Sequence, residues 1–182
     1  MTESIGSVTL QTEDGQEKLQ IVTNWTQEQQ QQIIELTKRD SQVCKLTDDP
    51  DRFADQETLT QWLASRDRST YAVLDLENQV VGSVWVTLKQ CENSAIPEEF
   101  GCTFAIRLYE KARGAGLAVP VLHIVITHFI NGQMYKESQH PGFWLRIKMG
   151  NEPAYRTYSR FGFTTAVQDK QFIWMTWMPE IT

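Results

Sequence analysis

The segment from Phe104 to Ala118, FAIRLYEKARGAGLA, joins an apolar stretch to the start of a second one through a short turn with two glycines. We expect a strand, a tight turn and a helix N-terminus. Backbone N–H groups at a helix N-terminus have no intrahelical acceptor and carry partial positive charge, and glycine lets an anion come close to them. The turn could therefore bind a pyrophosphate, with Arg113 adding a direct charge contact. The residues of this candidate site are Arg113, Gly114, Ala115, Gly116, Leu117 and Ala118.

The alternative is an ordinary turn between a strand and a helix, in which glycine only relieves steric crowding. Two common phosphate motifs do not fit the segment. A P-loop needs Gly-Lys followed by Ser or Thr, and no such triplet follows the turn. A dinucleotide fingerprint needs a third small residue at position 119, where this chain has Val119.

A second segment whose residues could take part in a reaction runs from Asn151 to Phe163, NEPAYRTYSRFGF. Asn151, Ala154 and Tyr158 are spaced by three and four residues, which places them on one face of a short helix. A tyrosine hydroxyl that projects from such a helix can act as a general acid. In the alternative interpretation, Tyr158 is a core aromatic residue whose hydroxyl is already hydrogen-bonded.

The elements that would position these residues follow from hydrophobic periodicity. The expected order is β-α-α-β-β-β-α-β-α-β-β, an α/β (α+β) arrangement with a mixed sheet and helices on both faces. The expected strands are 18–25, 70–76, 80–89, 100–109, 143–149, 163–167 and 171–178. The expected helices are 27–39, a helix from about 53 to 66, 117–130 and 152–161. Residues 1–17 are predicted to be a loose polar lead and residues 18–182 a single domain.

Composition narrows the class of protein. The chain has 182 residues, 41% of them hydrophobic, and a net charge of -6. This acidic balance argues against nucleic acid as a partner, because a phosphate backbone needs a basic surface. It is weakly compatible with a cationic substrate. No apolar run is long enough to span a membrane, and the polar N-terminus does not resemble a signal peptide. The three cysteines and three histidines lack disulfide or metal-ligand spacing, so we expect a cytoplasmic protein without a metal.

Taken together, the two motifs resemble those of the GCN5-related N-acetyltransferase (GNAT) family, over roughly Lys18 to Met178. That family carries Gln/Arg-x-x-Gly-x-Gly/Ala at its pyrophosphate turn, and this chain has Arg113-Gly114-Ala115-Gly116-Leu117-Ala118. The family's second motif is Asn-x-x-Ala, then Tyr, then Gly-Phe. The matching residues here are Asn151, Ala154, Tyr158, Gly162 and Phe163. The resemblance implies a mostly antiparallel sheet.

The resemblance also implies a mechanism in which an amine attacks the thioester of acetyl-CoA directly. The pantetheine arm would lie between strands 100–109 and 143–149 and pair with the backbone near Ile106, Arg107 and Leu108. Asn151 would contact the cofactor arm, and Tyr158 would stabilise or protonate the departing thiolate.

The amine must also lose a proton. Carboxylates near the fourth strand often accept it in the family, and Glu98 and Glu99 are the nearest candidates here. They could equally be part of a solvated loop, with a backbone carbonyl relaying the proton to water.

Other functions remain open at this point. The fold could serve as a non-catalytic acyl-CoA sensor, or the enzyme could use a larger acyl-CoA. The acceptor amine is unidentified. A homodimer is also possible, because the closing hairpin within 163–178 could present an edge strand.

Overall fold

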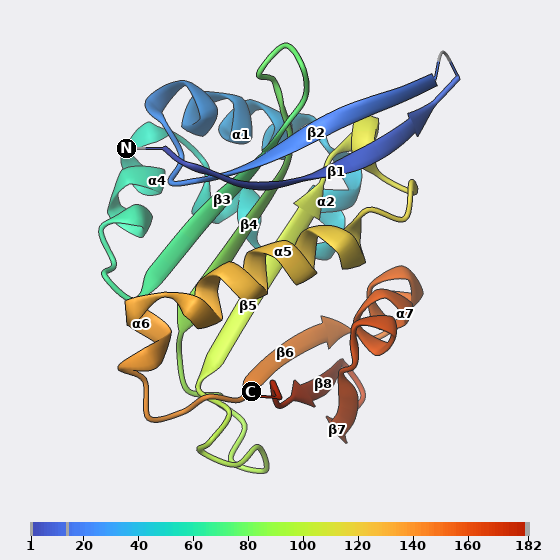
Figure 1. Ribbon diagram of the computed structural model, residues 1–182. Coiled ribbons are helices and arrows are strands. Elements are labelled where there is room, and N and C mark those ends of the chain that lie inside the picture. The colour runs from blue at the N-terminus through green and yellow to red at the C-terminus, as the bar shows by residue number, and fades with distance from the viewer. Residues whose placement is uncertain (1, 14, 181–182) are drawn as a thin grey trace.

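Eight strands form one sheet in the order β1-β2-β3-β4-β5-β6-β8-β7, in a computed structural model that describes residues 2–13 and 15–180. All neighbouring strands pair antiparallel except β5 and β6, which are parallel. The expected mixed, mostly antiparallel sheet is therefore confirmed (Figure 1). The strands are β1 Ser4–Thr12, β2 Gly15–Thr23, β3 Arg68–Leu74, β4 Val80–Leu88, β5 Cys102–Leu108, β6 Phe143–Lys148, β7 Thr164–Gln168 and β8 Phe172–Trp177.

Two of the helices, α1 and α7, begin and end where the sequence predicts. A capping box starts α1, since Thr26 accepts from the backbone of Gln29 and the Gln29 side chain accepts from Thr26. Gly162 ends α7 with a φ of 120°. The helices are α1 Gln27–Arg39, α2 Ser41–Leu46, α3 Asp49–Arg52, α4 Gln56–Leu63, η1 Glu110–Ala112, α5 Ala118–Asn131, α6 Gln133–Lys136 and α7 Glu152–Phe161.

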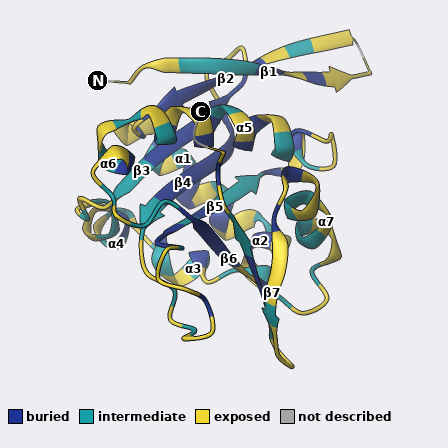
Figure 2. Ribbon diagram, turned by 60° about the horizontal axis from the view of Figure 1, so that its bottom comes forward, coloured by how far each residue is buried: buried dark blue, intermediate teal, exposed yellow. Residues whose placement is uncertain are grey.

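Helices cover both faces of the sheet, as expected, and a separate hydrophobic core fills each face. Alternate residues of one strand enter different cores because strand side chains alternate with a period of two. Ile21 of β2 packs with Leu122 of α5, whereas Val22 packs with Ile33 of α1 and Phe53. Figure 2 shows the central strands as buried and the outer hairpin of β1 and β2 as largely exposed at its tip.

The prediction of a loose polar lead is wrong for Ser4–Thr12, because these residues form the edge strand β1. Val8 and Leu10 are 7% and 4% exposed and pack in the core under α5. Thr9 and Gln11 alternate with them and face solvent. Two buried residues in a nine-residue polar segment are a weak signal, so the period of two was easily missed.

The strands β5 and β6 separate soon after they begin. They pair only at Cys102 with Phe143 and at Thr103 with Trp144. β5 stays paired with β4 over its whole length, and β6 with β8. A gap therefore opens between the C-terminal halves of β5 and β6, which diverge in Figure 1. The turn after β5 and the helix α7 after β6 lie beside this gap, so the topology brings the two sequence motifs together.

Candidate active site

Three cavities follow one another along the gap between β5 and β6. The first, which we call the turn-side cavity, has a volume of about 370 Å³ and is lined by Gly114, Gly116, Leu117 and Ala118 among others. The second, the splay cavity, measures about 170 Å³ and shares Tyr158 and Asn151 with the first. The third, the far cavity, measures about 390 Å³ and shares Arg146 with the second. A continuous cleft thus runs from the glycine turn past Tyr158.

The glycine turn has the geometry of an anion site. Gly114 and Gly116 have φ angles of +78° and +74°, a region that favours glycine. A Cβ atom on either would meet nothing within 4 Å, so both face open space. Across the segment from Gly114 to Ala118, none of the backbone N–H groups donates to another described residue. Leu117 is the N-cap residue of α5, and its side chain makes no capping hydrogen bond. These donors are left for an external acceptor.

Arg113 lines the turn-side cavity, but its guanidinium already has a partner. It forms an ion pair with Asp40, the N-cap residue of α2, and its Nε donates to the Leu108 carbonyl over 3.2 Å. Burial alone would raise the pKa of Asp40. The hydrogen bond and charge of Arg113 and two backbone N–H groups outweigh it and hold this pKa below its usual value. The structure therefore shows that Arg113 links α2 to the glycine turn. Its expected direct contact with a phosphate stays a prediction.

The three β5 residues expected to meet the pantetheine arm do not all face the gap. The Tyr109 N–H donates to the Val81 carbonyl, so the backbone of Tyr109 points toward β4. Successive residues of a strand point their backbone groups to opposite sides, which turns Ile106 and Leu108 toward the gap and Arg107 toward β4. Arg107 instead contributes its side chain, which lines both the turn-side and the splay cavities.

Asn151 and Tyr158 lie on one face of α7, as the spacing predicts, and both line the two cavities. Asn151 is the N-cap of α7, and its Oδ1 accepts from the Ala154 N–H over 3.3 Å. The ring of Tyr158 packs edge-on against Phe104 at a centroid distance of 5.6 Å. Within the described residues, the Tyr158 hydroxyl makes no hydrogen bond. The alternative of a core tyrosine with a satisfied hydroxyl is not what the structure shows.

The surroundings of Tyr158 keep its hydroxyl protonated. Burial raises the pKa of Tyr158 above its ordinary value, and the nearby charge of Arg107 only partly opposes this. A phenol that stays neutral at physiological pH can donate a hydrogen bond to a developing negative charge.

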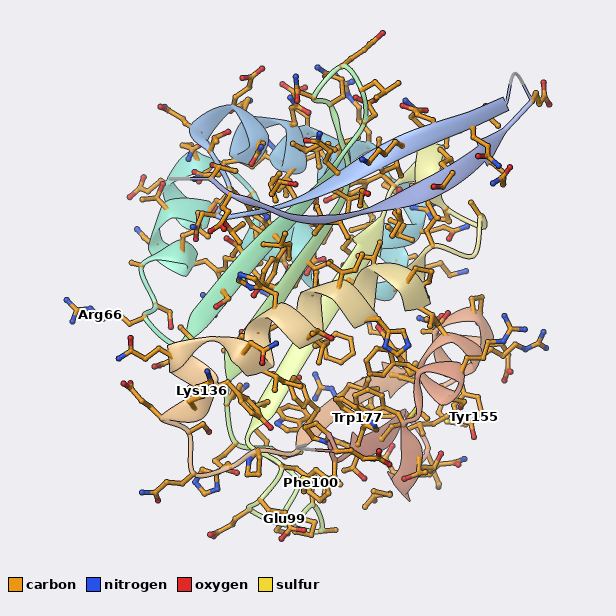
Figure 3. The ribbon with its side chains drawn as sticks, viewed as in Figure 1. Arg66, Glu99, Phe100, Lys136, Tyr155 and Trp177 are labelled. Carbon is orange, nitrogen blue, oxygen red and sulfur yellow. The ribbon has the colours of Figure 1, made fainter. Side chains whose placement is uncertain are left out.

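Glu98 and Glu99 do not reach the cleft. They lie exposed in the loop before β5, at the end where β5 and β6 are still paired. Ile96 anchors this loop on Trp144 and Trp174, and the Glu99 carbonyl accepts from the Gly142 N–H over 2.8 Å. Figure 3 shows Glu99 in this loop, away from α7 and the labelled Tyr155. The structure thus separates these two carboxylates from Tyr158, and we do not assign them the role of proton acceptor.

Of the charged residues that line the splay cavity, sequence reasoning named only Arg107, and only for its backbone. Asp49 is fully buried, and its two oxygens accept from Arg52 over 2.8 Å and from Arg107 over 2.5 Å. Pro50 lies in the first turn of α3, where proline is tolerated. The charge-rich composition of α3 was the available signal.

Among residues 2–13 and 15–180, no group of three or more His, Cys, Asp or Glu side chains is arranged to hold a metal ion. In the same part of the chain, no helix has both the length and the apolar character needed to cross a membrane.

Comparison with known proteins shows the fold. The GNAT domain of S. lividans PAT aligns with a TM-score of 0.63 and 12% identity, covering 94% of this chain and 96% of that one. The Campylobacter jejuni N-acetyltransferase PseH, in complex with acetyl coenzyme A, aligns with a TM-score of 0.57 and 14% identity over 89% and 99%. RimL, a ribosomal L7/L12 alpha-N-protein acetyltransferase, aligns with a TM-score of 0.68 and 13% identity over 98% and 96%.

No family model and no curated protein matches the sequence. The structural likeness is therefore much stronger than any likeness in sequence. The fold of this chain is the GNAT fold, as the sequence motifs led us to expect.

Proposed function

We propose that this chain transfers the acetyl group of acetyl-CoA to an amine. The observation that carries the proposal is the continuous cleft between the splayed strands, which has unpaired backbone donors at one end and Tyr158 in its middle. Its structural neighbours support the reaction class, since PseH and RimL are acetyltransferases and PseH was solved with acetyl coenzyme A.

The residues of the turn-side cavity suit the co-substrate. A pyrophosphate would accept hydrogen bonds from the N–H groups of Gly114 to Ala118, helped by the positive end of the α5 dipole. The pantetheine amides would pair with Ile106 and Leu108, whose backbone groups face the gap, as an added strand pairs with a sheet edge. The two carbonyls already accept from Arg107 Nη1 and Arg113 Nε, and each keeps a second lone pair for the arm. Asn151 would hold the same arm from the α7 side.

Tyr158 would act where the thioester breaks. A bond forms between the amine nitrogen and the acetyl carbon, the bond from that carbon to sulfur breaks, and the sulfur takes up a proton. A free thiol has a pKa of about 8.5 and an ordinary phenol about 10, a gap of about 1.5 units that the raised pKa of Tyr158 makes larger, so full proton donation is uphill. A hydrogen bond from the Tyr158 hydroxyl that strengthens as charge develops on sulfur is sufficient.

The amine must be neutral to attack, and the splay cavity favours that state. Both oxygens of Asp49 are taken by arginines, and the Asp48 side chain is 68% exposed. Positive charges near a bound amine lower its pKa. We therefore assign the released proton to water rather than to a buried carboxylate.

The test is an assay of thiol release from acetyl-CoA in the presence of a panel of amines. Amine-dependent release, with the acetylated amine identified by mass spectrometry, supports the proposal. Tight binding of acetyl-CoA without turnover of any amine would instead support the acyl-CoA sensor, and release with a longer acyl-CoA alone would support the larger donor.

A further inference from the structure

The splay cavity has the opposite charge to the protein as a whole. The chain carries a net charge of -6. Yet the cavity is lined by four cationic side chains and only two carboxylates, a local net charge of +2. The cations are Arg52, Arg107, Arg146 and Lys148, and the carboxylates are Asp48 and Asp49. An acidic protein that gathers positive charge in a cleft favours an anionic ligand there.

Two of the cations are bound by other side chains of the protein, so they are not free to bind a ligand. Arg52 and Arg107 share the buried Asp49, and the guanidinium carbons lie 5.9 Å and 5.1 Å from the centre of the Trp85 ring. The aromatic face and the shared carboxylate fix these side chains. Together they form one wall of the cavity. Because the two arginines share a single carboxylate, this wall keeps a net positive charge.

Arg146 is the cation most suited to a ligand. Trp144, Arg146 and Lys148 alternate along β6 with core residues, so Arg146 projects to the side of the sheet where α3 lies. Its guanidinium carbon lies 4.4 Å from the centre of the Phe172 ring. In the part of the chain that the structure describes, Arg146 forms no ion pair. Glu92 of the far cavity interacts electrostatically with Arg146, but the Glu92 carboxylate is paired with Lys89 over 2.5 Å. The planar donors of Arg146 are thus oriented by stacking and available for a carboxylate or phosphate.

The two ends of the splay cavity fit the two groups of one molecule. Tyr158 lies where the splay cavity meets the turn-side cavity, and Arg146 lies where it meets the far cavity. An amine that reacts beside Tyr158 can therefore place an anionic group at Arg146. Polyamines are disfavoured, because their additional positive charges would face the cationic wall.

We propose that the acceptor is an amine that also carries an anionic group, a carboxylate or a phosphate, bound by Arg146. The inference rests on the proposed function for the reaction, but binding of such an amine does not depend on turnover. It also replaces the weak expectation of a cationic substrate that the overall charge suggested.

The experiment titrates matched amines into the CoA-loaded protein and measures their dissociation constants by calorimetry. The pairs are O-phosphoethanolamine against ethanolamine and β-alanine against β-alaninamide, with spermidine as a cationic probe. We expect the anionic member of at least one pair to bind about 10- to 100-fold more tightly than its neutral partner, the effect of one charge-assisted hydrogen-bond set. Whichever pair shows the preference identifies phosphate or carboxylate as the recognised group.

Variants at Arg146 test the assignment. Arg146→Gln should abolish the preference and Arg146→Lys should retain part of it, whereas Arg160→Gln, an exposed α7 residue outside the three cavities, should leave it unchanged. Equal binding of neutral and anionic amines, or no binding of any anionic probe at millimolar concentration, overturns the inference. So does a loss of CoA affinity in Arg146→Gln, because Arg146 would then serve the phosphates of CoA.

The same panel in the thiol-release assay separates the two proposals. Anionic amines that bind but are not acetylated would leave the inference standing and remove the proposed function. Acetylation of neutral amines at the same rate as anionic ones would support the proposed function and contradict the inference.

Discussion

Arg107 Nε lies 2.5 Å from Oδ2 of Asp49, a fully buried carboxylate that reaches β5 from the short helix α3. This contact, with the second one from Arg52, joins α3 to the strand that borders the gap. It fixes one wall of the splay cavity and keeps Asp49 from acting as a proton acceptor.

We predict that Asp49→Ala lowers the free energy of unfolding by about 3 kcal/mol, because it leaves two arginines without their shared buried partner. Chemical denaturation followed by circular dichroism measures this. Asp48→Ala is the matched control, since its side chain is 68% exposed and lies 3.9 Å from Lys148; we expect a change below about 0.5 kcal/mol. Equal effects of the two substitutions would contradict the role of the Asp49 contacts.

Gly116→Ala should weaken CoA binding by about tenfold or more, because the added methyl group stands where the phosphate must approach the backbone. Gly15→Ala is a control with positive φ and equally open surroundings, in the hairpin between β1 and β2. Both variants should lose about 1 kcal/mol of stability from backbone strain, and only Gly116→Ala should lose CoA affinity in calorimetry. Unchanged affinity would mean that the turn is misassigned.

Tyr158→Phe should lower the rate of acetyl transfer by roughly 100-fold while the dissociation constant of CoA changes by less than about twofold. The control is Tyr155→Phe, three residues earlier on α7 (Figure 3). Its hydroxyl lies 3.4 Å from Thr165 Oγ1, and its side chain lines none of the three cavities. Steady-state kinetics with a competent amine measures both variants. If Tyr158→Phe turns over at the wild-type rate, the hydroxyl has no part in the reaction.

Stability should fall at alkaline pH because of buried tyrosines. Burial raises the pKa of Tyr71 to about 12, from an ordinary value of 10. Between these two pH values the unfolded state loses this proton while the folded state keeps it. Unfolding then releases a proton, so the free energy of unfolding falls by up to about 1.4 kcal/mol per pH unit.

Below pH 10 the Tyr71 hydroxyl is protonated in both states, and it contributes no slope. Denaturation midpoints from pH 9 to 11.5, compared between wild type and Tyr71→Phe, test this contribution. The variant should show a shallower alkaline decline. Parallel curves would mean that Tyr71 titrates normally in the folded protein.

Local sequence signals predicted most of what places the cleft. Capping residues indicated the start of α1, and proline and glycine indicated the two ends of α7. The glycine turn indicated the start of α5. The placement of the two motifs beside the same pair of strands followed from the resemblance to the GNAT family rather than from these local signals.

The features that could not be predicted from the sequence depend on contacts between residues that lie far apart along the chain. Arg113 pairs with Asp40, 73 positions earlier, and Arg107 with Asp49, 58 positions earlier. The helices α2 and α3 are too short to be predicted from periodicity, and tertiary ion pairs hold them. The charge of the splay cavity arises from α3, β5 and β6 together, and the net charge of the chain gave the opposite indication.

The most direct test of the central claim is a calorimetric titration of the purified protein with CoA and with acetyl-CoA. The cleft predicts binding of one molecule per chain at micromolar strength, with Gly116→Ala weakened and Gly15→Ala unchanged. No binding of either compound to the folded protein would contradict the claim, and the glycine turn and the face of α7 that carries Tyr158 would then be structural features of an α/β domain with another role.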